Sequence, residues 1–274
     1  MEFLSAEPPV HLVSQIPPAA VLGAFGLVVA ASSVAAIAIG LRKHDWLPVV
    51  VCIGALVCAL NEPIYDILGL IVYAENHPMA YTAFGREIPW FLVIGYLPWV
   101  GLLPYLISRA MHAGIPRAKL HLIAFASFLS VVVVESIGTS FDSWAYYGEA
   151  PLKFLVVAPQ MAPVPIVGGF LLFAVADRFD GWRRLGAGFV ISTLALPMVF
   201  ASASWPLYFG LNTDMPVAVD WILGVAMLGL SVGVVAATTA LAQTIREGRL
   251  LESPANTAAV QDSPEQDRNH ANQV

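Results

Sequence analysis

Two carboxylic acids stand four residues apart inside an apolar stretch of the chain. Residues 61–66 are Asn-Glu-Pro-Ile-Tyr-Asp, within the run Trp46–Tyr73, which is long enough to cross a lipid bilayer. An ionised carboxylate at the centre of a membrane helix costs about 2.5–3.5 kcal/mol or more, so acids at this depth are candidates for function. The four-residue spacing puts Glu62 and Asp66 on one helix face, and Tyr73 would continue that face.

The proline beside these acids should disturb the helix. Pro63 has no N–H, so it leaves the carbonyl of Ala59 without its helical partner and favours a kink next to Glu62. A structural role for the acids, as an ion pair or a hydrogen bond between helices, is the alternative to a chemical one.

Further acids are expected at the same depth on other helices. At 1.5 Å per residue, Glu62 lies about 24 Å past Trp46, and Glu135 lies a similar distance past Lys119. Glu135 shares a helix face with Asp142. Asp220 opens the last apolar run. Because polar groups of three helices should meet at one end of the bundle, we take Glu62, Asp66, Glu135 and Asp220 as candidate catalytic residues.

Aromatic and charged side chains accompany these acids. Inward-facing rings could stabilise a carbocation or an oxocarbenium ion, whereas outward-facing rings would form an interfacial aromatic belt. The candidate substrate-binding residues are Tyr65, Arg86, Trp90, Asp142, Trp144 and Tyr146.

Composition identifies an integral membrane protein. Of 274 residues, 58% are hydrophobic and 12% are charged, against about 25% charged in soluble domains, and the mean hydropathy is +0.74. No basic face suited to nucleic acid is visible. The two cysteines, Cys52 and Cys58, are expected to be free thiols, since six residues place them on different helix faces.

Seven apolar runs predict an all-α bundle of seven transmembrane helices. The runs are Ala19–Leu41, Trp46–Tyr73, Ile88–Ser108, Leu120–Phe141, Phe154–Ala176, Leu185–Phe209 and Val217–Gln243. We expect an extramembrane arm at residues 1–18, the transmembrane domain at 19–245 and a disordered cytoplasmic tail at 246–274, where polar residues dominate.

Basic residues predict the orientation of the bundle. Eleven of the 13 lysines and arginines fall in alternate connections or in the tail, and the other two, Arg86 and Lys153, fall in the opposite loops. The positive-inside rule therefore places the N-terminus outside and the C-terminus in the cytoplasm.

Several functional classes lack their signatures. The run Val217–Gln243 has no lysine for a retinal Schiff base. Asp177 and Asp180 lie in a short basic connection rather than in the paired Asp-rich motifs of membrane prenyltransferases. No Gly-rich phosphate loop, zinc motif or serine nucleophile elbow is present, and we expect neither a metal nor a cofactor.

Several short motifs together resemble a known family. They are residues 62–66 (Glu-Pro-Ile-Tyr-Asp), 81–86 (Tyr-Thr-Ala-Phe-Gly-Arg), 88–90 (Ile-Pro-Trp), Glu135, 146–148 (Tyr-Tyr-Gly) and 151–152 (Pro-Leu). This set is similar to the AveC-type spirocyclase family of actinomycete membrane proteins, and the likeness covers roughly residues 61–169. It implies spiroketal formation, sometimes with dehydration, on a polyketide, and location in a bacterial plasma membrane.

The layout also resembles that of membrane meroterpenoid cyclases, where an acid in the second helix and one at the start of the seventh begin cyclisation by protonation. In both cases a buried acid must keep its proton, and we expect Glu62 to be that general acid, with Asp66 or Glu135 as base. The third alternative is a carrier for an ion or small molecule. The expected partners are a lipophilic small-molecule substrate and the lipid bilayer.

Overall fold

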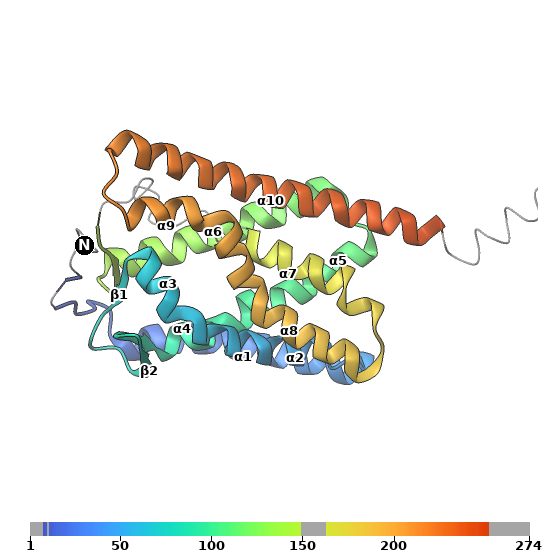
Figure 1. Ribbon diagram of the computed structural model, residues 1–274. Coiled ribbons are helices and arrows are strands. Elements are labelled where there is room, and N and C mark those ends of the chain that lie inside the picture. Colours follow the sequence, from blue (N-terminus) through green and yellow to red (C-terminus); the bar gives the residue numbers. More distant parts are fainter. Residues whose placement is uncertain (1–7, 10, 149–162, 252–274) are drawn as a thin grey trace, which may run out of the picture.

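The computed structural model describes residues 8–9, 11–148 and 163–251, and helices dominate it (Figure 1). The helices run mostly along one direction, and the short strands lie together at one end of the bundle, which we call the strand end. The α-helices are α1 (Pro18–Lys43), α2 (Leu47–Cys58), α3 (Glu62–Gly69), α4 (Trp90–Tyr96), α5 (Leu103–Ala113), α6 (Arg117–Ser140), α7 (Pro163–Ala174), α8 (Gly181–Val199), α9 (Trp205–Leu211) and α10 (Val217–Leu251). The strands are β1 (Ile71–Tyr73), β2 (Met79–Ala83), β3 (Arg86–Pro89) and β4 (Trp144–Tyr146).

Six stretches within the described ranges are long and apolar enough to cross a membrane. They are Pro18–Lys43, Leu47–Gly69, Trp90–Ala113, Arg117–Ser140, Gly181–Leu211 and Val217–Arg249. Large apolar side chains on them face outward, among them Leu27, Leu122 and Val232, as contact with lipid requires. These helices support the prediction of a membrane protein.

The predicted fifth span, Phe154–Ala176, falls partly on residues 149–162, outside the described ranges, and α7 is its described part. The seven-helix count therefore stays a prediction. Of the predicted tail, 252–274 lies outside the described ranges, while residues 246–251 continue α10 as helix. Arg249 anchors that last turn, since its Nη2 donates to the carbonyl of Phe173 at 3.1 Å.

Small residues let the spanning helices pack closely. A Cβ added at Gly54 of α2 would overlap the Ser192 hydroxyl and lie 2.7 Å from the carbonyl oxygen of Phe189 on α8. A Cβ at Gly101 would lie 2.8 Å from the Cα of Cys52. Close backbone approach at small residues is the usual mode of helix association in membranes.

The second span is interrupted next to the acids, as Pro63 predicted. A 3₁₀ turn, Ala59–Asn61, separates α2 from α3. The carbonyl of Ala59, which lacks a donor from Pro63, accepts a hydrogen bond from the Tyr81 hydroxyl at 2.7 Å. This hydrogen bond connects the 3₁₀ turn between α2 and α3 to strand β2.

The prediction that the helix continues to Tyr73 was wrong. Leu70 adopts a left-handed conformation with φ of 54°, which ends α3 and reverses the chain. Tyr73 therefore lies on strand β1 and returns toward the helix that precedes it. An αL residue at this position is a common way to end a helix.

Two other spans contain π-helical turns near their prolines. Residues Leu97–Leu102 join α4 to α5, and Phe200–Ser204 join α8 to α9. Pro104 and Pro206 lie in the first turn of the following helices, where a missing N–H is tolerated. Such π-turns are frequent at functional sites.

The end opposite the strands carries an ionic network, which we call the basic-end network. Arg184 donates from Nη1 to Asp45 at 2.7 Å and from Nε to Asp177 at 2.9 Å. Asp177 also forms a hydrogen bond with His112. The network joins the α1–α2 connection to the ends of α5 and α7 and to the start of α8.

Two antiparallel strand pairs close the strand end. Strand β1 pairs with β4, with Tyr73 opposite Trp144, and β2 pairs with β3 across a turn at Phe84 and Gly85. Both turn residues have positive φ, 52° and 72°, as a type I′ hairpin turn requires. The segment before α1 also packs here, because the Ser14 hydroxyl lies 2.8 Å from that of Ser143.

Candidate functional site

The acids of α3 lie in the interior of the protein. Glu62 begins the helix, with Pro63 in the first turn, where proline favours helix initiation. Asp66 follows one turn later. Glu62 is 7% exposed and Asp66 0%. In the described ranges neither acid forms an ion pair, so hydrogen bonds must compensate for their burial.

Tyrosine hydroxyls supply those hydrogen bonds. The Tyr73 hydroxyl lies 3.0 Å from Oε1 of Glu62 and 3.3 Å from Oδ1 of Asp66. The Tyr96 hydroxyl, from the next spanning helix, donates to Oε2 of Glu62. Oδ2 of Asp66 is buried and has no hydrogen-bond partner among the described residues.

One proton retained on the Glu62–Asp66 pair would account for both contacts of the Tyr73 hydroxyl. A tyrosine hydroxyl has a single proton, so Tyr73 can donate to only one of its two carboxyl neighbours. The other contact is a hydrogen bond only if that acid is protonated and donates to the Tyr73 oxygen. One proton on the Glu62–Asp66 pair therefore satisfies both contacts, and it also avoids two ionised carboxylates side by side.

A third acid, Glu135, lies on α6. Its Oε2 accepts hydrogen bonds from Nε1 of Trp144 at 2.6 Å and from the hydroxyl of Tyr146 at 2.9 Å. Both donors come from β4, which follows α6 after a short turn. With two donors to one oxygen, Glu135 is suited to hold negative charge.

One face of the β1–β4 pair carries side chains that contact all three acids. Tyr73 is directly opposite Trp144, and Tyr146 lies two residues further along the same strand. Side chains two residues apart point to the same face, as do those directly opposite in an antiparallel pair. The strand pair therefore joins the acids of α3 to the acid of α6.

Burial and the neighbouring acids keep these tyrosines protonated. Burial raises the pKa of Tyr73 well above its ordinary value, and the negative charges of Asp66, Glu62 and Glu135 raise it further. The pKa of Tyr146 is raised by burial first and by the same three acids. Both phenols thus stay protonated and act as donors.

Arg86 is the cation beside this group. Its guanidinium is close enough to Asp66 for an electrostatic interaction, donates to the hydroxyl of Tyr147 and lies 5.6 Å from the centre of the Tyr147 ring. Arg86 follows the β2–β3 turn, so the hairpin delivers a positive charge to the edge of the site.

Other predicted site residues lie apart from the acid group. Asp220 opens α10 and faces α9, since a Cβ at Gly210 would lie 3.0 Å from its Oδ1. Asp142 lies at the turn after α6 and accepts from the Gln15 side chain at 2.6 Å. Trp90 begins α4 and is exposed. The structure thus brings together Glu62, Asp66 and Glu135, but not Asp220.

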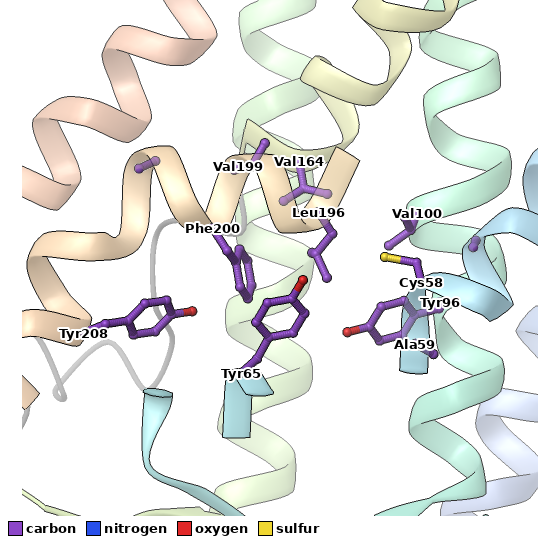
Figure 2. Packing of buried hydrophobic residues seen from close by; sticks show 12 residues of the cluster. Cys58, Ala59, Tyr65, Tyr96, Val100, Val164, Leu196, Val199, Phe200 and Tyr208 are labelled. Carbon is purple, nitrogen blue, oxygen red and sulfur yellow. The ribbon is translucent and has the colours of Figure 1, made fainter. Parts of the chain in front are cut away.

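Tyr65 lies in a buried cluster beside the acid group. Its ring meets that of Phe200 edge to face at 4.6 Å, and Tyr96 and Tyr208 belong to the same cluster (Figure 2). In Figure 2 the hydroxyl of Tyr96 points toward Tyr65. The Tyr65 hydroxyl is buried without a hydrogen-bond partner among the described residues.

An open groove adjoins this cluster between α3 and the segment from α8 to α9. Its volume is about 540 Å³. Its walls include Ile64, Tyr65 and Leu68 on one side and Phe200, Trp205 and Phe209 on the other.

Sequence reasoning missed Tyr96, the second donor to Glu62. The signal was available, because Tyr96 lies six residues past Trp90, or about 9 Å into the membrane from the strand end. Glu62 lies about 24 Å from the opposite end of a core about 30 Å thick, so the two depths agree. Tyr73 was expected near the acids, but through a helix that does not extend that far.

Searches of family models, of curated proteins and of solved structures give no match for this chain. The likeness to spirocyclases remains a prediction based on the motifs, and the geometry of the acid group carries the functional argument.

Proposed function

We propose that the protein is a membrane-embedded cyclase that acts on a lipophilic substrate and uses a protonated carboxylic acid to start ring closure. The observation that carries the proposal is the Tyr73 hydroxyl, which lies within hydrogen-bond reach of both Glu62 and Asp66. A proton retained on this pair inside an apolar protein would supply the general acid that the reaction requires.

For spiroketal formation, Glu62 donates its proton to the hydroxyl of a hemiketal. The carbon–oxygen bond breaks, water leaves, and an oxocarbenium ion remains. A second hydroxyl of the substrate then forms the new carbon–oxygen bond and releases its proton to Asp66 or Glu135. No atom changes oxidation state, and the net product is the spiroketal plus one water.

Protonation of an epoxide or alkene is the second candidate chemistry. The aromatic cluster of Tyr65, Phe200 and Tyr208 favours it, because ring faces stabilise carbocations and exclude water. The same Glu62 proton would start that reaction, and its product would be an isomer of the substrate.

We further propose that the strand end faces outward and that the membrane is a bacterial plasma membrane. The ends of α1, α5 and α10 that carry most basic residues lie opposite the strands, and the positive-inside rule assigns that end to the cytoplasm. The acid group would then lie near the outer side.

The first experiment compares lipid-soluble metabolites from cells that carry the intact protein, the Glu62→Gln variant or the Glu87→Gln variant at equal expression. Glu87 is exposed on β3 and serves as the matched control. In Glu62→Gln we expect a precursor to accumulate, one water heavier than the product for a spiroketal and isomeric with it for a terpenoid. Equal profiles for all three proteins would reject the cyclase and favour a carrier.

A second experiment tests the retained proton without any substrate. Infrared spectra of the solubilised protein at neutral pH should show the carbonyl band of a protonated carboxylic acid. Substitution of Glu62 by Gln should remove or shift this band, whereas Glu87→Gln should not change it. A wild-type spectrum with no such band would refute the proton count.

A further inference from the structure

The groove between α3 and the segment from α8 to α9 lies between apolar helices. Most of its lining belongs to two stretches that are long and apolar enough to cross a membrane, Leu47–Gly69 and Gly181–Leu211, and Asn212 and Thr213 follow the second. Ile64 and Trp205 on these walls are 44% and 53% exposed, so apolar side chains flank the opening. A molecule that enters here comes from the lipid phase rather than from water.

The size and lining of the groove suit a small lipophilic molecule. About 540 Å³ is within the range of 300–1,000 Å³ that small-molecule sites occupy. Apolar walls predominate, and polar side chains are few, among them Asn61, Tyr65 and Asn212. Sites for oxygenated hydrophobic ligands have this composition.

Tyr65 provides a second, independent observation. The side chain lines the groove, is only 7% exposed, and its hydroxyl has no hydrogen-bond partner among the described residues. Buried hydroxyls are nearly always paired, so an unpaired one calls for a partner that binds later. Tyr65 also lies three residues after Glu62 on the same helix, which places the groove next to the acid pair.

We propose that this groove admits the substrate from the bilayer and holds it by an oxygen atom that accepts a hydrogen bond from Tyr65. The inference rests on the proposed cyclase and adds the class of ligand, a lipophilic molecule with an oxygen atom that accepts a hydrogen bond. Tyr96 connects the groove to the acid pair, because it neighbours Tyr65 in the buried cluster and donates to Glu62 (Figure 2).

Photolabelling in lipid nanodiscs tests the site. One probe is a long-chain hydroxyketone that carries a diazirine and an alkyne, and the second is the same chain without oxygen. The hydroxyketone should label peptides that contain residues 61–68 and 197–213. Ala201→Trp, which fills the groove, should reduce this labelling about tenfold, while Leu194→Trp, on the exposed surface of α8, should not.

Tyr65→Phe tests the hydrogen bond. The wild-type protein should prefer the hydroxyketone over the hydrocarbon about tenfold, and the variant should lose that preference while it still binds both chains. Equal labelling of the wild type by both probes would show occupation by lipid chains only and would overturn the assignment. Labelling outside the two peptides would also overturn it.

The experiments distinguish a failure of the groove as substrate site from a failure of the proposed cyclase function. Glu62→Gln should keep the photolabelling of the groove and lose the conversion of precursor to product in the metabolite comparison. If Ala201→Trp abolished labelling but left conversion at the wild-type level, the groove would not be the substrate site and the cyclase would stand. If Glu62→Gln converted substrate normally and labelling held, the cyclase would fail and the groove would remain a binding site.

Discussion

Gly138 on α6 packs against the indole of Trp144, which is one of the two donors to Glu135. A Cβ at this position of α6 would overlap three carbons of the Trp144 indole, all inside the 3.0 Å that real Cβ atoms do not cross. The indole would have to move by about 1 Å or more to regain an ordinary contact of about 3.5 Å. Its Nε1, now 2.6 Å from Glu135, would then leave hydrogen-bond range.

The magnitude follows from three contributions. Overpacking of a tight site costs about 1–3 kcal/mol. Loss of a hydrogen bond to a carboxylate costs about 1.5–3 kcal/mol. Alanine in place of glycine within a helix returns about 1 kcal/mol. We therefore expect Gly138→Ala to lower the free energy of unfolding by about 1.5–5 kcal/mol.

Reversible unfolding in mixed detergent micelles measures this loss. Gly229→Ala is the matched control, because no atom lies within 4 Å of a Cβ added there, and it should be neutral or stabilising. In a Trp144→Ala background the clash is gone, so Gly138→Ala should cost nothing. An equal cost in both backgrounds would refute the steric reasoning.

Three further predictions concern other parts of the fold. Tyr81→Phe should lower the free energy of unfolding by about 0.5–1.5 kcal/mol, because the Ala59 carbonyl loses its side-chain donor; an unchanged value would contradict this. For Asp177, burial opposes ionisation, but hydrogen bonds within the basic-end network hold its pKa below the ordinary value of 3.8. Its contribution to the free energy of unfolding is therefore fully present above pH 3.8. That contribution is lost as the pH falls through the lower pKa of the folded state. Thermal unfolding of Asp177→Asn should accordingly depend less on acid pH than that of the wild type, and parallel curves would count against the assignment. Phe84→Asn should stabilise the protein by about 1 kcal/mol in the same unfolding assay, since Phe84 has positive φ and is 74% exposed. A destabilised variant would instead indicate that the Phe84 ring anchors the hairpin in the membrane interface.

Hydropathy was sufficient to predict the six spanning stretches within the described ranges, because a span requires a long apolar run whatever its neighbours. The observed Leu47–Gly69 and Val217–Arg249 begin within one residue of the predicted runs. Depth counting placed Glu62 and Glu135 at one level, since helical rise is nearly constant. These inferences depend on local geometry only.

The details that depend on chain reversal could not be predicted. Nothing in the run Trp46–Tyr73 marks Leu70 as a left-handed residue, because leucine rarely adopts that conformation. The β1–β4 pairing is equally hidden, since three-residue strands give almost no periodic signal. The donors to the acids are therefore the part of the site that required three-dimensional structure.

The β1–β4 pair also determines how the acid group assembles during folding. Glu62 and Tyr73 are 11 residues apart, and Glu135 and Trp144 are 9 apart, so each half can form from a short segment as it emerges. Pairing of Ile71 with Tyr146 then closes a long loop, a slow and entropically costly step. Until that closure the two halves are independent local units, and a chain arrested before it would contain every donor and every acid without a joined site.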